Sequence, residues 1–151
     1  MRSKQTSSVP EITNDRIDLW RSVSDSWKKL TRDVEKNLER VGLGIPELRI
    51  LRTLEDSGPT QMARLSLAAL LTQPAITVIV DKLEDQGYVE RVRSKEDRRV
   101  INIEITENGE ALLKDALKIH KQFVEKMLKG LSDSELEELA LIMNKLALKI
   151  S

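Results

Sequence analysis

The stretch that decides the fold lies in the middle of the chain, where residues 72–109 read TQPAITVIVDKLEDQGYVERVRSKEDRRVINIEITENG. Up to about Gln86 the apolar residues recur at three- and four-residue steps, which is typical of an amphipathic helix. Residues 88–93 and 100–105 are then β-rich, and in the second of them apolar and polar side chains alternate. The stretch therefore predicts a helix followed by a two-stranded β-ribbon.

Local signals set the limits of these elements. Thr72 is a suitable N-cap, Pro74 is tolerated in a first helical turn, and Gly87 supplies the stop. The inward face of the helix is expected to consist of Ile76, Ile79, Val80 and Leu83. All six residues at the ribbon tip, 94–99, are polar. Because an isolated hairpin is barely stable in water, the ribbon must pack on the preceding helices.

Helical patterns precede this stretch. Residues 1–13 form a polar tail that we expect to be flexible, and residues 14–44 contain a long amphipathic helix that ends at its glycines. A second helix begins at Pro46, and a third, over residues 61–71, is expected to be capped by Thr60.

Two further helices follow the ribbon. Thr106 begins the first, which runs to about Lys129, and Ser132 with Glu135 three residues later forms a capping box for the last. The helices at 14–41 and 132–150 carry more apolar surface than one small core needs. Such a surface usually marks an interface between proteins.

Composition narrows the range of functions. The chain has 151 residues, 25 basic and 25 acidic side chains, one histidine and no cysteine. A basic field over the whole chain is excluded, so any nucleic-acid binding must come from a local patch. The composition also excludes disulfides, thiol chemistry, cysteine-bound zinc and multi-histidine metal sites. We therefore expect no metal and no cofactor, and we interpret His120 as a packed or surface residue.

Motifs for catalysis and for targeting are lacking in the sequence. It holds no Gly-rich phosphate loop, no HExxH and no nucleophile elbow, so we expect a protein that is not an enzyme. No apolar run approaches the length of a membrane span, and the first ten residues lack the apolar stretch of a signal peptide. A cytoplasmic location is expected.

The densest basic stretch coincides with the ribbon. Five basic residues fall within nine positions, against two acidic ones: Arg91, Arg93, Lys95, Arg98 and Arg99, with Glu96 and Asp97. A charge run is usually a solvated surface. Here it follows a helix-turn-helix pattern, and the planar fork of arginine suits phosphate groups and narrow minor grooves. A scaffold protein would also explain the long amphipathic helices, but not this ribbon.

At this point the residues resemble a known family. The stretch from Thr72 to Val89 is similar to the recognition helix of the MarR family of transcription regulators. Asp97-Arg98-Arg99, followed by an apolar strand and Thr106-Glu107-Asn108-Gly109, resembles the wing signature of that family. Ala69 and Leu70 depart from the family pattern, which often has Leu and then Gly at the turn between the two motif helices.

The resemblance implies a mainly α fold with a small β-ribbon, in which a winged helix-turn-helix lies between long terminal dimerisation helices. Residues 45–105 would form the DNA-binding domain, and residues 14–44 and 106–151 would form the dimer. A homodimer would bind a pseudo-palindromic double-stranded site, with recognition helix 72–86 in the major groove and wing 94–99 at the minor groove or backbone.

The groove-facing residues follow from this placement: Thr72, Gln73, Pro74, Thr77 and Val78. Gln73 can pair with adenine, and the Thr77 methyl group can touch a thymine methyl group. Many family members carry Arg where Val78 stands, so we expect thymine methyl groups, DNA shape and phosphates to matter more than arginine–guanine pairs. The alternative for Gln73 and Thr77 is a solvated helix face with a capping role.

Basic residues of the recognition helix and the ribbon are expected to contact the DNA backbone. Lys82, Arg91, Arg93 and Lys95 are candidate phosphate binders, which position a protein on DNA without reading sequence. Arg98 is predicted to reach the minor groove, with Arg99 beside it in the DNA-binding set. The family pattern would pair Asp97 with Arg99 and so order the wing. The alternative for each arginine is a solvated charge.

Some relatives bind small aromatic or phenolic anions, and a comparable effector site is a further expectation. By resemblance, Trp27, Lys28, Ile45 and Arg99 could line it, because an aromatic wall and a cation suit a small carboxylate. The alternative is that these side chains serve packing alone.

Overall fold

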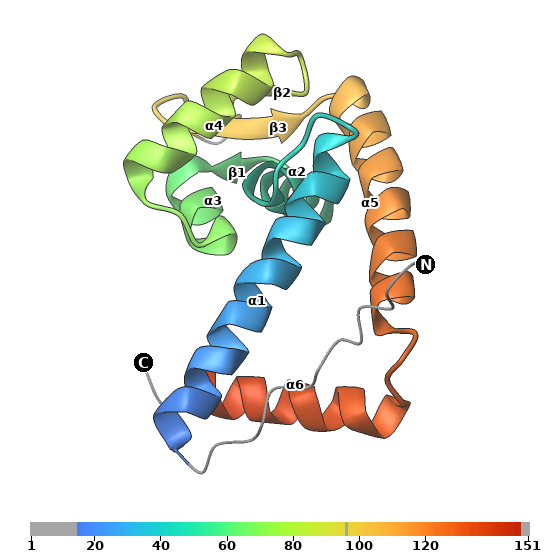
Figure 1. Cartoon of the computed structure of the whole chain (residues 1–151). Helices are drawn as coiled ribbons and strands as arrows, with labels where there is room; N and C mark the ends of the chain where they lie inside the picture. The colour runs from blue at the N-terminus through green and yellow to red at the C-terminus, as the bar shows by residue number, and fades with distance from the viewer. Residues whose placement is uncertain (1–14, 96, 149–151) are drawn as a thin grey trace. The chain divides into compact units, whose positions relative to one another are not determined.

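The computed structural model describes residues 15–95 and 97–148. The tail predicted over residues 1–13 therefore lies outside the described residues. The chain divides between Asp33 and Val34 into two units, and we describe each unit by itself. The elements follow one another in the order α1 (Arg16–Glu39), α2 (Ile45–Ser57), β1 (Thr60–Gln61), α3 (Met62–Ala69), α4 (Gln73–Asp85), β2 (Val89–Arg93), β3 (Ile101–Ile105), α5 (Glu107–Leu128) and α6 (Asp133–Ala147) (Figure 1).

The core lies in the second unit, where α2 packs against α3, α4, α5 and the sheet. The inward face predicted for the recognition helix is confirmed: Ile76, Val80 and Leu83 are fully buried, and Ile79 packs against the core. Helix α2 supplies four further core residues, Leu48, Ile50, Leu51 and Leu54. The apolar spacing of α2 and α4 therefore fixes which face each helix turns to the core.

The sheet has three antiparallel strands in the order β1-β3-β2, one more than the predicted ribbon. Thr60 and Gln61 pair with Ile103 and Asn102, so the prediction that Thr60 caps α3 was wrong. The Thr60 hydroxyl donates to the carbonyl of Gly58 at 2.8 Å, and Gln61 occupies the N-cap position of α3. A strand of two residues shows no periodicity, and its pairing depends on where β3 lies in the folded chain.

Thr106 and Gly109, the two defined residues of the Thr-x-x-Gly signature, hold the start of α5 against the chain that leads into β2. The Thr106 hydroxyl accepts a hydrogen bond from the Gly109 amide at 3.1 Å and donates to the Gly87 carbonyl at 2.7 Å. The Thr106 amide donates to the Tyr88 carbonyl at 3.1 Å. A Cβ atom on Gly109 would lie 2.1 Å from the Tyr88 carbonyl oxygen. The start of α5 therefore lies directly against the chain that leads into β2, and only glycine fits there.

The last helix has a different environment. The capping box of Ser132 and Glu135 is confirmed, and hydrogen bonds from the Ser132 amide and hydroxyl lower the pKa of Glu135. Helix α6 buries no residue, although its apolar side chains recur at helical spacing. In α1, Trp20 and Trp27 are also exposed.

No single helix in the described ranges is both long and apolar enough to cross a membrane. Helices α3 and α4 reach that length and apolarity only when they are taken together across a bend of 103°. Leu65 of α3 and Ile76 of α4 are fully buried in the core, which accounts for their apolar composition.

The turn between α3 and α4 contains a residue with unfavourable backbone geometry. Leu70 adopts the left-handed conformation, with φ 57° and ψ 44°, at the position where the family pattern often has glycine. For a residue with a side chain this conformation costs about 1–2 kcal/mol. The Leu70 side chain is 79% exposed, so it gains little burial in return.

We therefore expect Leu70→Gly to raise the free energy of unfolding by about 0.5–1 kcal/mol in urea titrations, after the greater backbone entropy of glycine is taken into account. Leu67→Gly is the matched control, because Leu67 is similarly exposed, at 77%, but lies within α3. It should lower stability by about 1 kcal/mol. Equal losses in both variants would contradict the strain at Leu70.

Candidate nucleic-acid interface

Helices α3 and α4 form a helix-turn-helix. They are bent by 103° across the turn at residues 70–72, within the range usual for this motif. Thr72 is the N-cap residue of α4, as its position predicted, but its side chain makes no capping hydrogen bond. Instead the Gln73 side-chain amide donates to the Ser66 hydroxyl at 2.8 Å, and that hydroxyl donates to the Ala63 carbonyl at 2.9 Å. Gln73 thus links the two helices of the motif.

The outer face of α4 is uncharged over its first turns. Pro74, Thr77 and Val78 are exposed, Val78 by 68%. The Thr77 hydroxyl donates to the Gln73 carbonyl one turn earlier, at 3.0 Å. This bond satisfies the hydroxyl proton within the helix and leaves the Thr77 methyl group on the surface.

Lys82, a predicted phosphate binder, joins α4 to α2. Its ammonium group lies 2.9 Å from Oε1 of Glu47, a carboxylate that is only 9% exposed. The other oxygen of Glu47 accepts a hydrogen bond from the Gly44 amide at 3.1 Å, which caps α2. Phosphate binding by Lys82 stays a prediction, and it would compete with this ion pair.

Arg91 also faces the protein. Its guanidinium group contacts Asp81 at 2.5 Å and forms a second ion pair with Glu84, both on α4. The hydrogen bond with Asp81 raises the pKa of Arg91, although partial burial acts in the opposite direction. The Arg91 amide donates to Glu84 as well, at 3.1 Å. Arg91 therefore links β2 to α4. A phosphate bound by Arg91 would have to share the guanidinium group with Asp81 and Glu84.

Four basic residues at and beside the wing loop are exposed: Arg93 at the end of β2, and Lys95, Arg98 and Arg99 in the loop. The predicted pairing of Asp97 with Arg99 needs a correction, because the Asp97 carboxylate accepts from the backbone amide of Arg99 at 2.9 Å. The Val100 amide donates to the Asp97 carbonyl at 2.9 Å. Asp97 thus orders the loop as a local turn, and the Arg99 guanidinium group takes no part in it.

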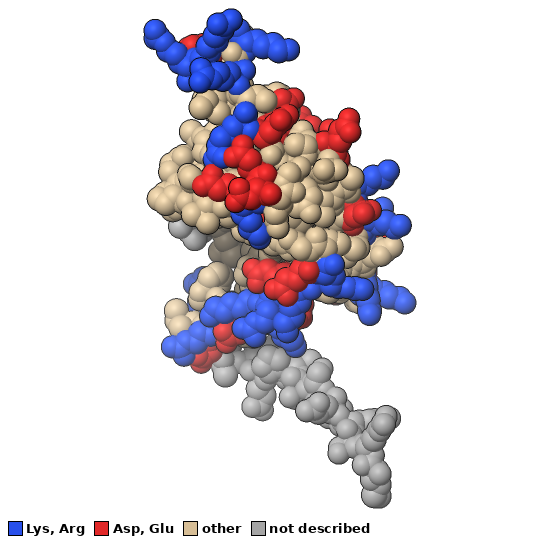
Figure 2. Space-filling view, turned by 90° about the horizontal axis from the view of Figure 1, so that it is seen from above, with Lys and Arg blue, Asp and Glu red and all other residues tan. Residues whose placement is uncertain are grey.

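Charge is distributed in groups over the surface. In the view of Figure 2, Lys and Arg side chains gather locally and alternate with Asp and Glu side chains and with uncharged surface. The chain has zero formal net charge, so its 25 basic side chains are balanced by 25 acidic ones. Contacts to a polyanion must therefore come from local groups such as the wing.

The residues predicted for an effector site belong to separate parts of the chain. Trp27 and Lys28 lie in the first unit, where Lys28 is 3.6 Å from Asp25. Ile45 begins α2 and packs against the core, and Arg99 lies in the wing of the second unit. The effector site thus stays a prediction.

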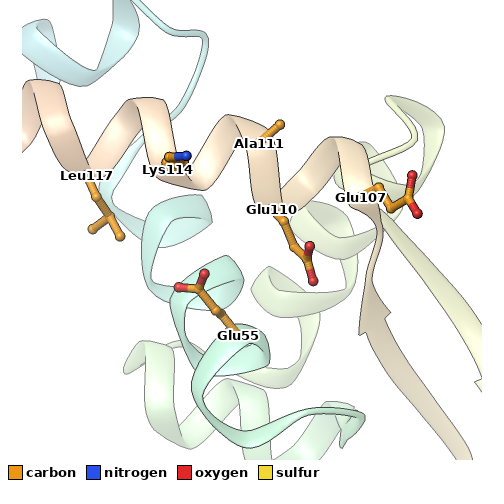
Figure 3. Close-up of a pocket in the computed structure, with 6 residues that line it drawn as sticks. All are labelled: Glu55, Glu107, Glu110, Ala111, Lys114 and Leu117. Atoms are coloured by element: carbon orange, nitrogen blue, oxygen red, sulfur yellow. The ribbon is translucent and has the colours of Figure 1, made fainter.

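Two cavities lie elsewhere, between α2 and α5. Figure 3 shows the first, of about 520 Å³, where Glu55 of α2 and Glu110 of α5 project into the same space and Lys114 is the one basic lining residue. Its excess of carboxylates disfavours a small organic anion. The second cavity, of about 570 Å³, is lined in part by Leu117, Val124 and His120. Sequence patterns gave no signal for either cavity, because helices distant in the chain form them.

His120 is half-buried, and its Nδ1 atom has no hydrogen-bond partner within the described part of the chain. Across residues 15–95 and 97–148, no group of three or more His, Asp or Glu side chains is arranged to hold a metal ion. The interpretation of His120 as a packed or surface residue agrees with this partial burial.

These features define a class of protein. A helix-turn-helix followed by an antiparallel ribbon with a basic loop is a winged helix-turn-helix, a DNA-binding module. The MarR family model matches residues 43–101. The chain belongs to the MarR family and is a DNA-binding transcription regulator rather than an enzyme.

Individual relatives agree with this assignment. The chain is 30% identical over 126 residues to the HTH-type transcriptional regulator MhqR of Bacillus subtilis, covering 83% of this chain and 87% of MhqR. The transcriptional regulator BldR of Sulfolobus solfataricus has 29% identity and a TM-score of 0.74, covering 89% of this chain and 95% of BldR. FabT of Streptococcus pneumoniae, solved in complex with DNA, shares the fold, with 24% identity and a TM-score of 0.74, over 90% of this chain and 97% of FabT.

Proposed function

We propose that this protein regulates transcription as a homodimer on a pseudo-palindromic DNA site, with one α4 helix in each of two successive major grooves. The observation that carries the proposal is the exposed outer face of α4 next to a β-ribbon with four exposed basic residues, one at the end of β2 and three in the wing. The wing, residues 94–99, would contact the minor groove or the phosphates. A protein that acts on chromosomal DNA in this way would work in the cytoplasm.

Unpartnered apolar surface supports the dimer. On α6, Leu139, Ile142 and Leu146 are exposed at helical spacing, although the helix buries no residue in its own chain. A continuous apolar stripe of this kind is costly in water and usually marks a protein interface. We assign residues 14–44 and 106–151 to dimerisation, with residues 45–105 as the DNA-binding domain.

We also propose that a small aromatic or phenolic effector modulates DNA binding. Trp27 and Lys28 are adjacent in α1 and offer an aromatic surface and a cation, the chemistry that a small aromatic carboxylate needs. Ile45 and Arg99 complete the proposed set. An effector that changes the spacing of the two α4 helices would change the affinity for DNA.

The regulator is tested by fluorescence anisotropy with DNA from the region upstream of its own gene and with random DNA as competitor. Specific binding about 10³-fold tighter than binding to random DNA would support a sequence-specific regulator. Binding should also weaken between 50 and 200 mM salt, because phosphate contacts release counterions. Absence of binding to either DNA at low salt would contradict the proposal.

Arg98→Ala tests the wing. Loss of an arginine inserted in the minor groove should weaken specific DNA binding by about 10-fold, with no change in the midpoint of thermal unfolding, since Arg98 is exposed. Arg52→Ala is the charge-matched control, because Arg52 lies on α2 in an ion pair with Asp56 and should leave DNA affinity unchanged. Equal effects of the two substitutions would mean that the wing supplies only general charge.

A further inference from the structure

We propose that α4 reads thymine through its C5-methyl group, so that methyl contacts rather than hydrogen bonds set its sequence preference. This inference rests on the proposed binding of α4 in the major groove and specifies what the helix recognises there. It starts from the hydrogen-bond donors of α4, which the fold has already engaged.

Three residues of α4 carry a side-chain N–H or O–H donor, and each makes a hydrogen bond within the protein. Gln73 donates to Ser66 at 2.8 Å, Thr77 donates to the Gln73 carbonyl at 3.0 Å, and Lys82 donates to Glu47 at 2.9 Å. Guanine is recognised in the major groove through its N7 and O6 acceptors, which need donors. Gln73 and Lys82 keep further N–H protons, but each side chain is held in place by its bond within the protein, so turning it toward guanine would weaken or break that bond.

The outer face of the first turns of α4 is apolar. Pro74, Thr77 and Val78 lie at i, i+3 and i+4 and so share one face of the helix, and all three are exposed. They present a proline ring, the Thr77 methyl group and the two Val78 methyl groups. The next residue on this face, Asp81, is held by Arg91 at 2.5 Å.

Thymine is the base that fits this surface. Its C5-methyl group is the one apolar group that a base of unmodified DNA presents in the major groove, and threonine methyl groups are known to contact it. Arg64 on α3, Arg93 of β2 and the wing residue Arg98 are exposed on the same unit, and they can hold the phosphates while α4 contacts the bases. The occupant of this apolar face is therefore the thymine-bearing floor of a major groove.

The experiment begins with selection of the preferred duplex from random DNA by the full-length protein. Each thymine of one half-site is then replaced in turn by deoxyuridine, which loses the methyl group and keeps the base pairing. At one or more positions affinity should fall about fourfold, the effect of one methyl group left in water, and about 15-fold when both half-sites are changed. Replacing guanines by 7-deazaguanine should have a smaller effect.

Protein variants identify the residue that makes the contact. Thr77→Ser removes the methyl group and keeps the hydroxyl bond to Gln73, whereas Thr77→Val keeps a methyl group and loses that bond. In the Thr77→Ser or the Val78→Ala protein, replacing thymine by deoxyuridine at one position of the half-site should no longer lower the affinity. In the Thr77→Val protein this loss of affinity should persist. Leu67→Ala is the control, since Leu67 is an exposed apolar residue on α3 rather than α4.

The outcomes separate this inference from the proposed function. A preferred sequence that is bound equally well with thymine and with uridine, or that is more sensitive to 7-deazaguanine, would overturn methyl recognition and leave the regulator intact. Failure to select any preferred sequence would contradict the proposed function and, with it, this inference.

Discussion

Gly109→Ala is expected to lower the free energy of unfolding by about 3 kcal/mol, the upper part of the range for overpacking a close contact. The added Cβ atom would lie 2.1 Å from the Tyr88 carbonyl oxygen and 2.8 Å from Cγ1 of Ile105. Neither the Tyr88 backbone nor the start of α5 can move without breaking the Thr106 hydrogen bonds. Alanine favours helices more than glycine does, so helix propensity alone predicts the opposite sign.

The measurement is urea unfolding followed by circular dichroism. Gly130→Ala is the control, because a Cβ atom at Gly130 would have no heavy atom within 4 Å beyond its chain neighbours. Its effect should stay within about 0.5 kcal/mol. A stable Gly109→Ala protein would show that the junction of β2 and α5 can relax. DNA affinity should fall together with stability, because this junction also positions the wing.

Ile142→Glu is expected to convert the proposed dimer to monomers and to reduce affinity for a two-half-site duplex by about 100-fold or more. Ile142 is 49% exposed in a helix that buries no residue, so the substitution affects the interface and not the core of the chain. A dimer binds its second half-site as an intramolecular step, and a monomer loses that gain. Sedimentation velocity and anisotropy on the same samples measure both effects.

Asn144→Glu provides the matched control. It adds the same negative charge two residues further along α6, and a step of two residues places it on the opposite face of the helix. This variant should remain dimeric and should bind DNA as the wild type does. If Ile142→Glu also stayed dimeric, the dimer interface would have to lie elsewhere than on this face of α6.

The sequence by itself determined the elements of the winged module. Spacing of three and four residues placed Ile76, Val80 and Leu83 on the buried face of α4, and the change to a period of two placed β2 and β3. Capping signals at Thr106 and Ser132 marked the starts of α5 and α6. These features are local, because a helix or strand is encoded by side chains a few residues apart.

Only the tertiary structure decided which hydrogen-bond and ion-pair partners the residues of the candidate site have. The sequence alone indicated no ion-pair partner for Lys82 or Arg91. In the folded chain Lys82 pairs with Glu47, and Arg91 pairs with Asp81 and Glu84. Gln73 was predicted to contact a DNA base. Because α3 and α4 cross, its side-chain amide instead donates a hydrogen bond to the Ser66 hydroxyl.

Strand β1 has the same explanation, since Thr60 pairs with a residue of β3 far along the chain. A sequence shows which groups can donate, accept or carry charge, but the partner of each group is whichever complementary atom the folded chain brings within about 3 Å. Local periodicity therefore predicted the module, whereas contacts between distant segments decided which of its side chains remain free to meet DNA.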